Sequence, residues 1–328
     1  MRVLLVSLVA IITASSLVYH SGLIGNHNLP SAPSFSIFNS SPDDHPSWLI
    51  WTSSAAPLRL RREVIRSTWQ SYYHPTTPFT SRFVISTPSD EWLPVIKQEN
   101  DTYGDIIIIS NSNHNENDKE FARTLKPFDM LVYLRDLGRK WDFVTKVDDD
   151  TFVVANKARD DFLVPHRDAK RTVITRVIQY ARPHVFPSGQ FYTLTWDLVE
   201  LLANLYQTTT RDLFAEMSGG GAYGRKKREL GKRHEDFMIA NLMVEAKEPF
   251  EYVELSAAQS FDVIDVKGGF TAVTNQAVNV HRMKSDEEYL WVAAMFDEKG
   301  FRGTELAGVN YEEKLEGSAA ELRKTLGI

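Results

Sequence analysis

Apolar and polar residues alternate along this chain in two distinct periods beyond residue 47. Short runs of branched and aromatic side chains, typical of strands, cover residues 48–51, 82–86, 106–109 and 142–147. Apolar residues at three- and four-residue steps predict helices over residues 58–72, 90–100 and 119–137. Strands that alternate with helices predict a mainly parallel sheet covered on both faces. We expect the four consecutive isoleucines at 106–109 to form a fully buried strand.

The second half of the chain has a more mixed pattern and no internal repeat. Strands are predicted over 171–177, 191–194 and 278–281, and a helix over 196–206. Residues 218–233 combine consecutive glycines with a cluster of arginine and lysine, which does not suit a packed core. This insert fits a solvated loop or a basic lid over an anionic ligand. A nuclear-import signal is disfavoured by the apolar N-terminal segment.

The N-terminal residues differ from the rest. Residues 3–19 carry no charge and reach the short end of a membrane span, so residues 1–19 are interpreted as a signal anchor or transmembrane helix. A cleaved signal peptide and a buried helix are the alternatives. Residues 20–47, rich in Ser, Pro, Asn and Gly, read as a flexible lumenal stem before a globular body at 48–328. Glycosylation sequons at Asn39 and Asn100 fit a lumenal body.

Composition narrows the functional classes. The chain of 328 residues is 43% hydrophobic and carries a net charge of −6, which suits a globular protein and gives no support for nucleic-acid binding. The absence of cysteine excludes disulfides, thiolate metal sites and a cysteine nucleophile.

Three consecutive carboxylates, Asp148, Asp149 and Asp150, lie between two apolar runs. Aspartate is common in turns, so the triplet could be a solvated hairpin tip. The alternative is a hard divalent cation, because Mg²⁺ and Mn²⁺ prefer carboxylate oxygens and turn mutual repulsion into shared coordination. Ligands of this kind often follow the carboxyl ends of strands in sheet enzymes.

Other polar residues each have a functional and a structural interpretation. Arg62 and Arg66 lie four apart on one helix face, which suits phosphate or carboxylate recognition but is also common as surface charge. Glu235 and Asp236 open an apolar helical stretch and could simply complement a helix N-terminus. His281 ends a predicted strand, where a lone histidine is usually structural.

Taken together, these segments resemble glycosyltransferase family 31, the inverting β-1,3-galactosyl- and N-acetylglucosaminyltransferases. The resemblance runs from Arg62 to His281 and keeps the family's motif order. The matching segments are RxxIRxTW at 62–69, Asp105-Ile106 with 118–126, KxDDDxF at 146–152, 186–194, Glu235-Asp236-Phe237 and His281.

The resemblance implies a fold and an activity. The fold would be of GT-A type, a Rossmann-like α/β/α sandwich with a mixed sheet. The enzyme would move a hexose or N-acetylhexosamine, galactose first, from a UDP-sugar to a glycan hydroxyl, with inversion and a β-1,3 linkage. Mn²⁺ or Mg²⁺ would be required. The setting would be the Golgi membrane, single-pass type II with a lumenal body, or a secreted form if the N-terminal segment is cleaved.

The resemblance also implies residue roles. Asp150 and His281 would bind the metal directly and Asp148 through a water, while Asp149 would hydrogen-bond the ribose. Arg62, Arg66 and Lys146 would bind the donor or support its pocket. Asp236 would be the general base, and Gly189 and Glu235 would shape the acceptor pocket.

Several departures mark a divergent member whose sugar specificity cannot be transferred. Phe191 stands where the family usually has a second glycine, and Phe237 replaces valine. The basic insert is unusual, and the cysteines common in animal members are missing. Two rival functions are a metal-dependent phosphohydrolase and a catalytically silent carbohydrate-binding relative. Retention of both acidic motifs argues against the silent relative.

Overall fold

A computed structural model describes residues 45–109, 119–181, 184–210, 235–264 and 269–303 of the chain. These residues all belong to one compact unit, Ser40–Ile328. The predicted membrane span, nearly all of the stem and the basic insert at 218–233 lie outside the described residues. Within the described ranges, no helix is both long and apolar enough to cross a bilayer.

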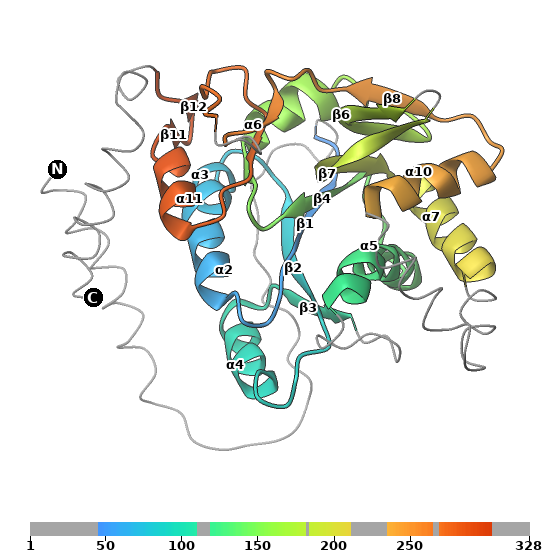
Figure 1. The fold of residues 1–328 in the computed structure, drawn as a ribbon, viewed down its shortest axis with the longest axis horizontal. Helices are drawn as coiled ribbons and strands as arrows, with labels where there is room; N and C mark the ends of the chain where they lie inside the picture. The colour runs from blue at the N-terminus through green and yellow to red at the C-terminus, as the bar shows by residue number, and fades with distance from the viewer. Residues whose placement is uncertain (1–44, 110–118, 182–183, 211–234, 265–268, 304–328) are drawn as a thin grey trace, which may run out of the picture. The chain divides into compact units, whose positions relative to one another are not determined.

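A seven-stranded mixed sheet forms the centre of the fold (Figure 1), with the strand order β3-β2-β1-β4-β7-β6-β8. The first four strands of this order are parallel, β7 runs antiparallel to both β4 and β6, and β8 is parallel to β6. The strands are β1 (Trp48–Ser53), β2 (Thr80–Ser86), β3 (Ile106–Ile109), β4 (Phe143–Asp148), β6 (Thr172–Ala181), β7 (His184–Thr195) and β8 (Glu251–Glu254).

Helices cover both faces of this sheet, and the strands are apolar on both sides as a result. In β1, Trp48 and Ile50 pack in one hydrophobic cluster, whereas Leu49 and Trp51 pack in the other. The first cluster includes residues of α2 (Arg59–Ile65), α4 (Leu93–Tyr103), α6 (Ala155–Ala158) and α11 (Asp286–Ala293). The second includes residues of α5 (Lys119–Asp136), α7 (Trp196–Leu205) and α10 (Glu235–Glu245). The predicted α/β/α sandwich with a mixed sheet is therefore confirmed.

Two predicted elements differ from the structure. The helix expected over 58–72 is divided into α2, the π-helical turn η1 (Arg66–Gln70) and α3 (Ser71–Tyr73), and Thr68 has the non-helical angles φ −107° and ψ −112°. The Thr68 hydroxyl donates to the carbonyl of Val64 at 2.7 Å, a side-chain bond that bends helices. The isoleucine strand β3 is not fully buried, because it lies at the sheet edge and leaves Ile107 and Ile108 half-buried.

A small second sheet follows the carboxyl end of β4, in the order β5-β10-β9. It consists of β5 (Phe152–Val153), β10 (Asn279–His281) and β9 (Ser260–Asp262). The strand at 279–281 was predicted, whereas β5 and β9 are too short to give a periodic signal. The remaining elements are η2 (Arg159–Leu163), η3 (Tyr206–Thr210), β11 (Phe296–Asp297) and β12 (Gly300–Phe301).

Candidate active site

The aspartate triplet lies at the point where the strand order of the main sheet reverses. β1 pairs with β2 on one side and with β4 on the other, and Ser53 at the end of β1 is in register with Asp148 at the end of β4. The backbone N–H of Thr151 donates to the carbonyl of Asp148 at 3.1 Å, which closes a turn containing Asp149 and Asp150. In open α/β sheets the crevice at such a reversal, beyond the carboxyl ends of the strands, is the usual ligand site.

Strand pairing in the second sheet brings His281 to the triplet. β5 leaves the turn at Phe152, which pairs with Val280 of β10. The N–H of Met283 donates to the carbonyl of Asp150 at 3.2 Å and fixes the two segments together. His281 thus lies beside the aspartates, although it is distant from them in sequence.

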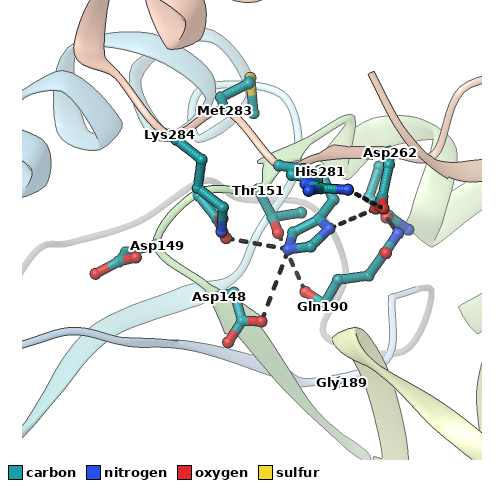
Figure 2. A network of polar contacts seen from close by, with 12 residues as sticks. Asp148, Asp149, Thr151, Gly189, Gln190, Asp262, His281, Met283 and Lys284 are labelled. Atoms are coloured by element: carbon teal, nitrogen blue, oxygen red, sulfur yellow. Dashed lines mark hydrogen bonds and ion pairs between the residues drawn. The ribbon is translucent and has the colours of Figure 1, made fainter. Parts of the chain in front are cut away.

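The side chains of Asp148, Asp150 and His281 converge on one point, and Figure 2 shows the contact between Asp148 and His281. His281 Nε2 lies 3.2 Å from Asp150 Oδ1 and 4.0 Å from Asp148 Oδ2, and the candidate ligand atoms all lie within 4.8 Å of one another. Donor atoms that share a hard divalent ion at about 2.1 Å are themselves roughly 3–4 Å apart, so this set fits Mn²⁺ or Mg²⁺. Asp149 points away from His281 in Figure 2.

Charge pairing dominates the electrostatics of this cluster. Burial disfavours the charged imidazole, but hydrogen bonds to Asp150 and Asp262 outweigh it and raise the pKa of His281 to about 9. Burial also opposes ionisation of Asp150, yet hydrogen bonds to His281 and Lys284 hold its pKa well below the ordinary range. The contacts therefore favour a carboxylate at Asp150, as a cation ligand requires, whereas an ion that binds His281 Nε2 has to displace the proton that the raised pKa retains.

Asp262 is a member of the cluster that the sequence did not reveal. It is in register with His281 across the parallel strands β9 and β10, and its Oδ1 accepts a hydrogen bond from His281 Nδ1 at 2.6 Å. Asp262 holds one ring nitrogen of His281 (Figure 2), and the other, Nε2, faces Asp150 at 3.2 Å, as in histidines that a carboxylate orients toward a metal. The contact depends on the register in which two three-residue strands pair, and the sequence carries no signal for that register.

Lys146 joins the two acidic motifs. Its buried ammonium donates to Asp148 Oδ1 at 2.7 Å and to the carbonyl of Gly189 at 2.6 Å, and it forms an ion pair with Glu235. Burial opposes its charge, but Asp148 and Glu235 together hold the pKa of Lys146 well above the ordinary value. Burial raises the pKa of Glu235 to about 7 despite this pairing. Lys146 thus orients site carboxylates, and its predicted contact with the donor stays a prediction.

Asp236 lies against Gly189, where α10 packs on β7. A Cβ atom at position 189 would be 3.2 Å from Asp236 Oδ2, so the close approach depends on glycine. The other oxygen, Oδ1, accepts the N–H of Phe237 at 2.7 Å. Glu235 and Asp236 therefore differ in their surroundings, as the assignment of only one of them as a base requires.

The two aromatic departures from the family motif have structural partners. Phe191 is buried in the core opposite Val147 of β4. Phe237 packs edge-to-face on Phe186 with ring centroids 6.1 Å apart. The substitution at 191 therefore affects the packing of the sheet.

Arg62 and Arg66 are held by carboxylates of the protein itself. The Arg62 guanidinium binds Glu99 at 2.7 and 2.8 Å, and both side chains have 0% exposure. Arg62 also donates to Ser54 Oγ and to the carbonyls of Ala55 and Ala56, in the loop after β1. Arg66 binds Asp105 at 2.8 and 2.9 Å and Glu99 at 2.8 Å. These contacts favour support of the pocket wall over direct contact with the donor.

Arg61, which directly precedes the motif at 62–69, was not selected from the sequence. It donates to Asp286 at 2.5 Å, to the carbonyl of Met283 at 2.9 Å and to the carbonyl of Asp149 at 3.2 Å. Arg61 thus braces the aspartate turn against the segment after His281.

The buried Lys126 and the half-buried Asp149 interact electrostatically near the end of β1. The Lys126 ammonium donates to the carbonyl of Ser54 at 2.7 Å, and burial lowers its pKa to about 8. Burial, with Asp150 and Asp148 adding repulsion, raises the pKa of Asp149 to about 6. Lys126 belongs to the motif segment at 118–126, of which Asp118 lies outside the described residues.

Residues 60–175 match the model of a family described as Galactosyltransferase, so the predicted resemblance is confirmed over that segment. With the acidic cluster at the reversal of the strand order, this match supports a glycosyltransferase, and the mixed sheet covered on both faces is the arrangement expected of a GT-A-type fold. A comparison with curated proteins gives no significant match.

A comparison with solved structures also finds glycosyltransferases, all at low identity. A glycosyltransferase involved in the glycosylation of the major capsid of PBCV-1 is 10% identical, with 76% of this chain and 100% of that chain covered and a TM-score of 0.40. The galactosyltransferase LgtC with donor and acceptor sugar analogues is 12% identical (81% and 99% covered, TM-score 0.42). Mouse xyloside xylosyltransferase 1 is 10% identical (73% and 98% covered, TM-score 0.35).

Proposed function

Because residues 60–175 match the Galactosyltransferase family, we propose that this protein is an inverting, metal-dependent glycosyltransferase. It would transfer a hexose or N-acetylhexosamine, galactose first, from a UDP-sugar to a glycan hydroxyl and form a β-1,3 linkage. The observation that carries the proposal is the joining of two acidic motifs through one buried lysine. Lys146 contacts Asp148 of the triplet and Glu235, the neighbour of Asp236.

The first acidic motif would hold the cation that holds the donor. Asp150 and His281 offer ligand atoms 3.2 Å apart, with Asp148 Oδ2 at 4.0 Å from the histidine. A divalent ion there supplies Lewis-acid stabilisation of the charge that develops on the departing diphosphate. Asp262 keeps the imidazole oriented through its 2.6 Å contact with Nδ1. Arg61 keeps the turn in place through the carbonyl of Asp149.

The second acidic motif would supply the base. Inversion requires one carboxylate that takes the proton from the acceptor hydroxyl as it attacks the anomeric carbon. Asp236 is the candidate, because Glu235 is occupied by its ion pair with Lys146. Gly189 allows the Asp236 carboxylate to lie directly against β7, since any Cβ there would be 3.2 Å from Oδ2.

The cellular setting stays a prediction from the sequence. Residues 1–19 as a signal anchor and the Golgi lumen as the site of action both depend on residues outside the described ranges. The same holds for a role of the basic insert at 218–233.

The test is an assay of UDP release by the full-length protein with Mn²⁺, UDP-sugars and a panel of acceptor glycans. UDP release that depends on an acceptor supports a transferase, whereas acceptor-independent phosphate release would favour a phosphohydrolase. UDP binding without turnover on any acceptor would favour the silent relative.

Asp236→Asn refines this test. The variant is nearly isosteric and should lower transfer by two or more orders of magnitude, roughly the size of a general-base effect, with unchanged UDP affinity. Asp160→Asn is the matched control, because Asp160 is an exposed aspartate paired with Arg159 outside the acidic cluster. Normal turnover by Asp236→Asn, with an inactive Glu235→Gln, would exchange the two roles.

A further inference from the structure

Lys284 reaches the aspartate turn from the protein surface. Its ammonium contacts Asp150 Oδ2, while the other oxygen of the same carboxylate, Oδ1, faces His281. The Lys284 side chain is 68% exposed, whereas that of Asp150 is only 10% exposed. The ammonium of this mostly exposed side chain therefore contacts the Asp150 oxygen that does not face His281.

The other cations around the cluster are occupied by protein groups. Lys146 is buried among Asp148, Glu235 and the carbonyl of Gly189. Arg61 is buried and held by Asp286 and two backbone carbonyls. Within the described part of the chain, Lys284 is thus the cation that both contacts the triplet and is mostly exposed.

The backbone at Lys284 is fixed even though its side chain is exposed. Its N–H donates to Glu288 at 2.6 Å, and Ser285 caps α11 in a reciprocal pair of bonds with Glu288 at 3.0 and 3.1 Å. The neighbouring acid Asp286 is neutralised by Arg61. The four-carbon stem of lysine can therefore swing its charge from Asp150 to a nearby anion without moving the chain.

We propose that Lys284 binds the diphosphate of the nucleotide-sugar donor, exchanging its contact with Asp150 for a phosphate oxygen. The inference rests on the proposed function, because a divalent ion at Asp148, Asp150 and His281 would hold that diphosphate beside this carboxylate. An ammonium here would neutralise phosphate charge that a single divalent ion leaves uncompensated. A surface ion pair that merely screens Asp150 is the alternative interpretation.

The experiment compares UDP with uridine as probes, because they differ only in the diphosphate. Binding of each to the full-length protein is measured at saturating Mn²⁺, by calorimetry for UDP and by ligand-observed NMR for uridine. Lys284→Met should weaken UDP binding about 10-fold or more, the scale of a hydrogen bond to a charged group, and leave uridine binding unchanged. Lys284→Arg should recover most of the UDP affinity.

Lys140→Met is the matched control. Lys140 is 67% exposed and also forms one ion pair, with Glu200 at 2.8 Å, but it precedes β4 and so lies at the opposite end of that strand from the triplet. This variant should bind both probes as the parent protein does. Mn²⁺ affinity, measured by electron paramagnetic resonance, checks that Lys284→Met keeps the cation site.

Three outcomes would overturn the inference. Equal UDP affinity of Lys284→Met and the parent protein would leave Lys284 as a surface ion pair. Parallel losses of UDP and uridine affinity would indicate a distorted pocket. If the parent protein binds neither probe, the proposed function fails and this inference fails with it, which differs from a failure of Lys284 alone.

Discussion

Replacing Arg62 with methionine separates a structural role from donor binding. In the folded protein, Arg62 makes two bonds to Glu99 and three to Ser54, Ala55 and Ala56. Methionine fills much of the same space but supplies none of these donors. The substitution leaves the carboxylate of Glu99 fully buried, with Arg66 as its remaining partner at 2.8 Å.

The expected loss follows from those contacts. Removing one partner of a buried ion pair costs about 3–5 kcal/mol, and the retained contact with Arg66 points to the lower end, about 3 kcal/mol. For a domain of this size, 1 kcal/mol lowers the midpoint of thermal unfolding by roughly 2–4 °C, so a decrease of roughly 6–12 °C is expected. Donor affinity below the unfolding temperature should change less than about 2-fold, because the Arg62 donors bond to protein groups instead.

Differential scanning calorimetry measures the first quantity, and titration with UDP at 10 °C measures the second. Arg302→Met is the control, since Arg302 is 62% exposed and its ion pair with Asp297 is 3.8 Å long. That variant should stay within about 0.5 kcal/mol of the parent protein. A large loss of UDP affinity in Arg62→Met with an unchanged unfolding midpoint would refute the supporting role and restore direct donor binding.

Two further predictions test the site. Gly189→Ala should lower kcat about 5–10-fold and leave UDP affinity unchanged. The new Cβ, 3.2 Å from Asp236 Oδ2, displaces the Asp236 carboxylate by a few tenths of an ångström. An unchanged kcat would show that the close approach of Asp236 to Gly189 is irrelevant to transfer. Asp262→Asn should make the unfolding midpoint, measured in EDTA, depend less on pH, because the hydrogen bond from His281 to Asp262 helps to raise the pKa of His281. The pKa of His281 is raised from 6.5 to about 9, so its contribution is full below pH 6.5 and is lost as pH rises through 9. Parallel curves of unfolding midpoint against pH for the two proteins would exclude this contribution of Asp262.

Local patterns in the sequence determined much of the architecture. The apolar run before the triplet was predicted as a strand at 142–147 and is β4, Phe143–Asp148; the helix predicted at 119–137 is α5, Lys119–Asp136. These elements are set by contacts within one strand or a few helical turns, so their period is visible in the chain. The triplet and its position after a strand could be identified for the same reason.

The neighbours of each element were decided only by the tertiary structure. Helical spacing showed that Arg62 and Arg66 share a face, but not that Glu99 and Asp105 would occupy it. The isoleucines of β3 have the composition of a buried strand, yet their place at the sheet edge leaves two of them half-buried.

The candidate site itself depends most on long-range pairing. His281 meets Asp150 because β10 pairs with β5, and Asp262 supports His281 because β9 pairs with β10 in one register. Although β10 was predicted as a strand, the sequence has no local signal for its pairing with β5 and β9, because these partners lie far away in the chain. A shift of one residue would turn each side chain to the opposite face of the sheet, so the cluster exists only once the complete fold has fixed the register.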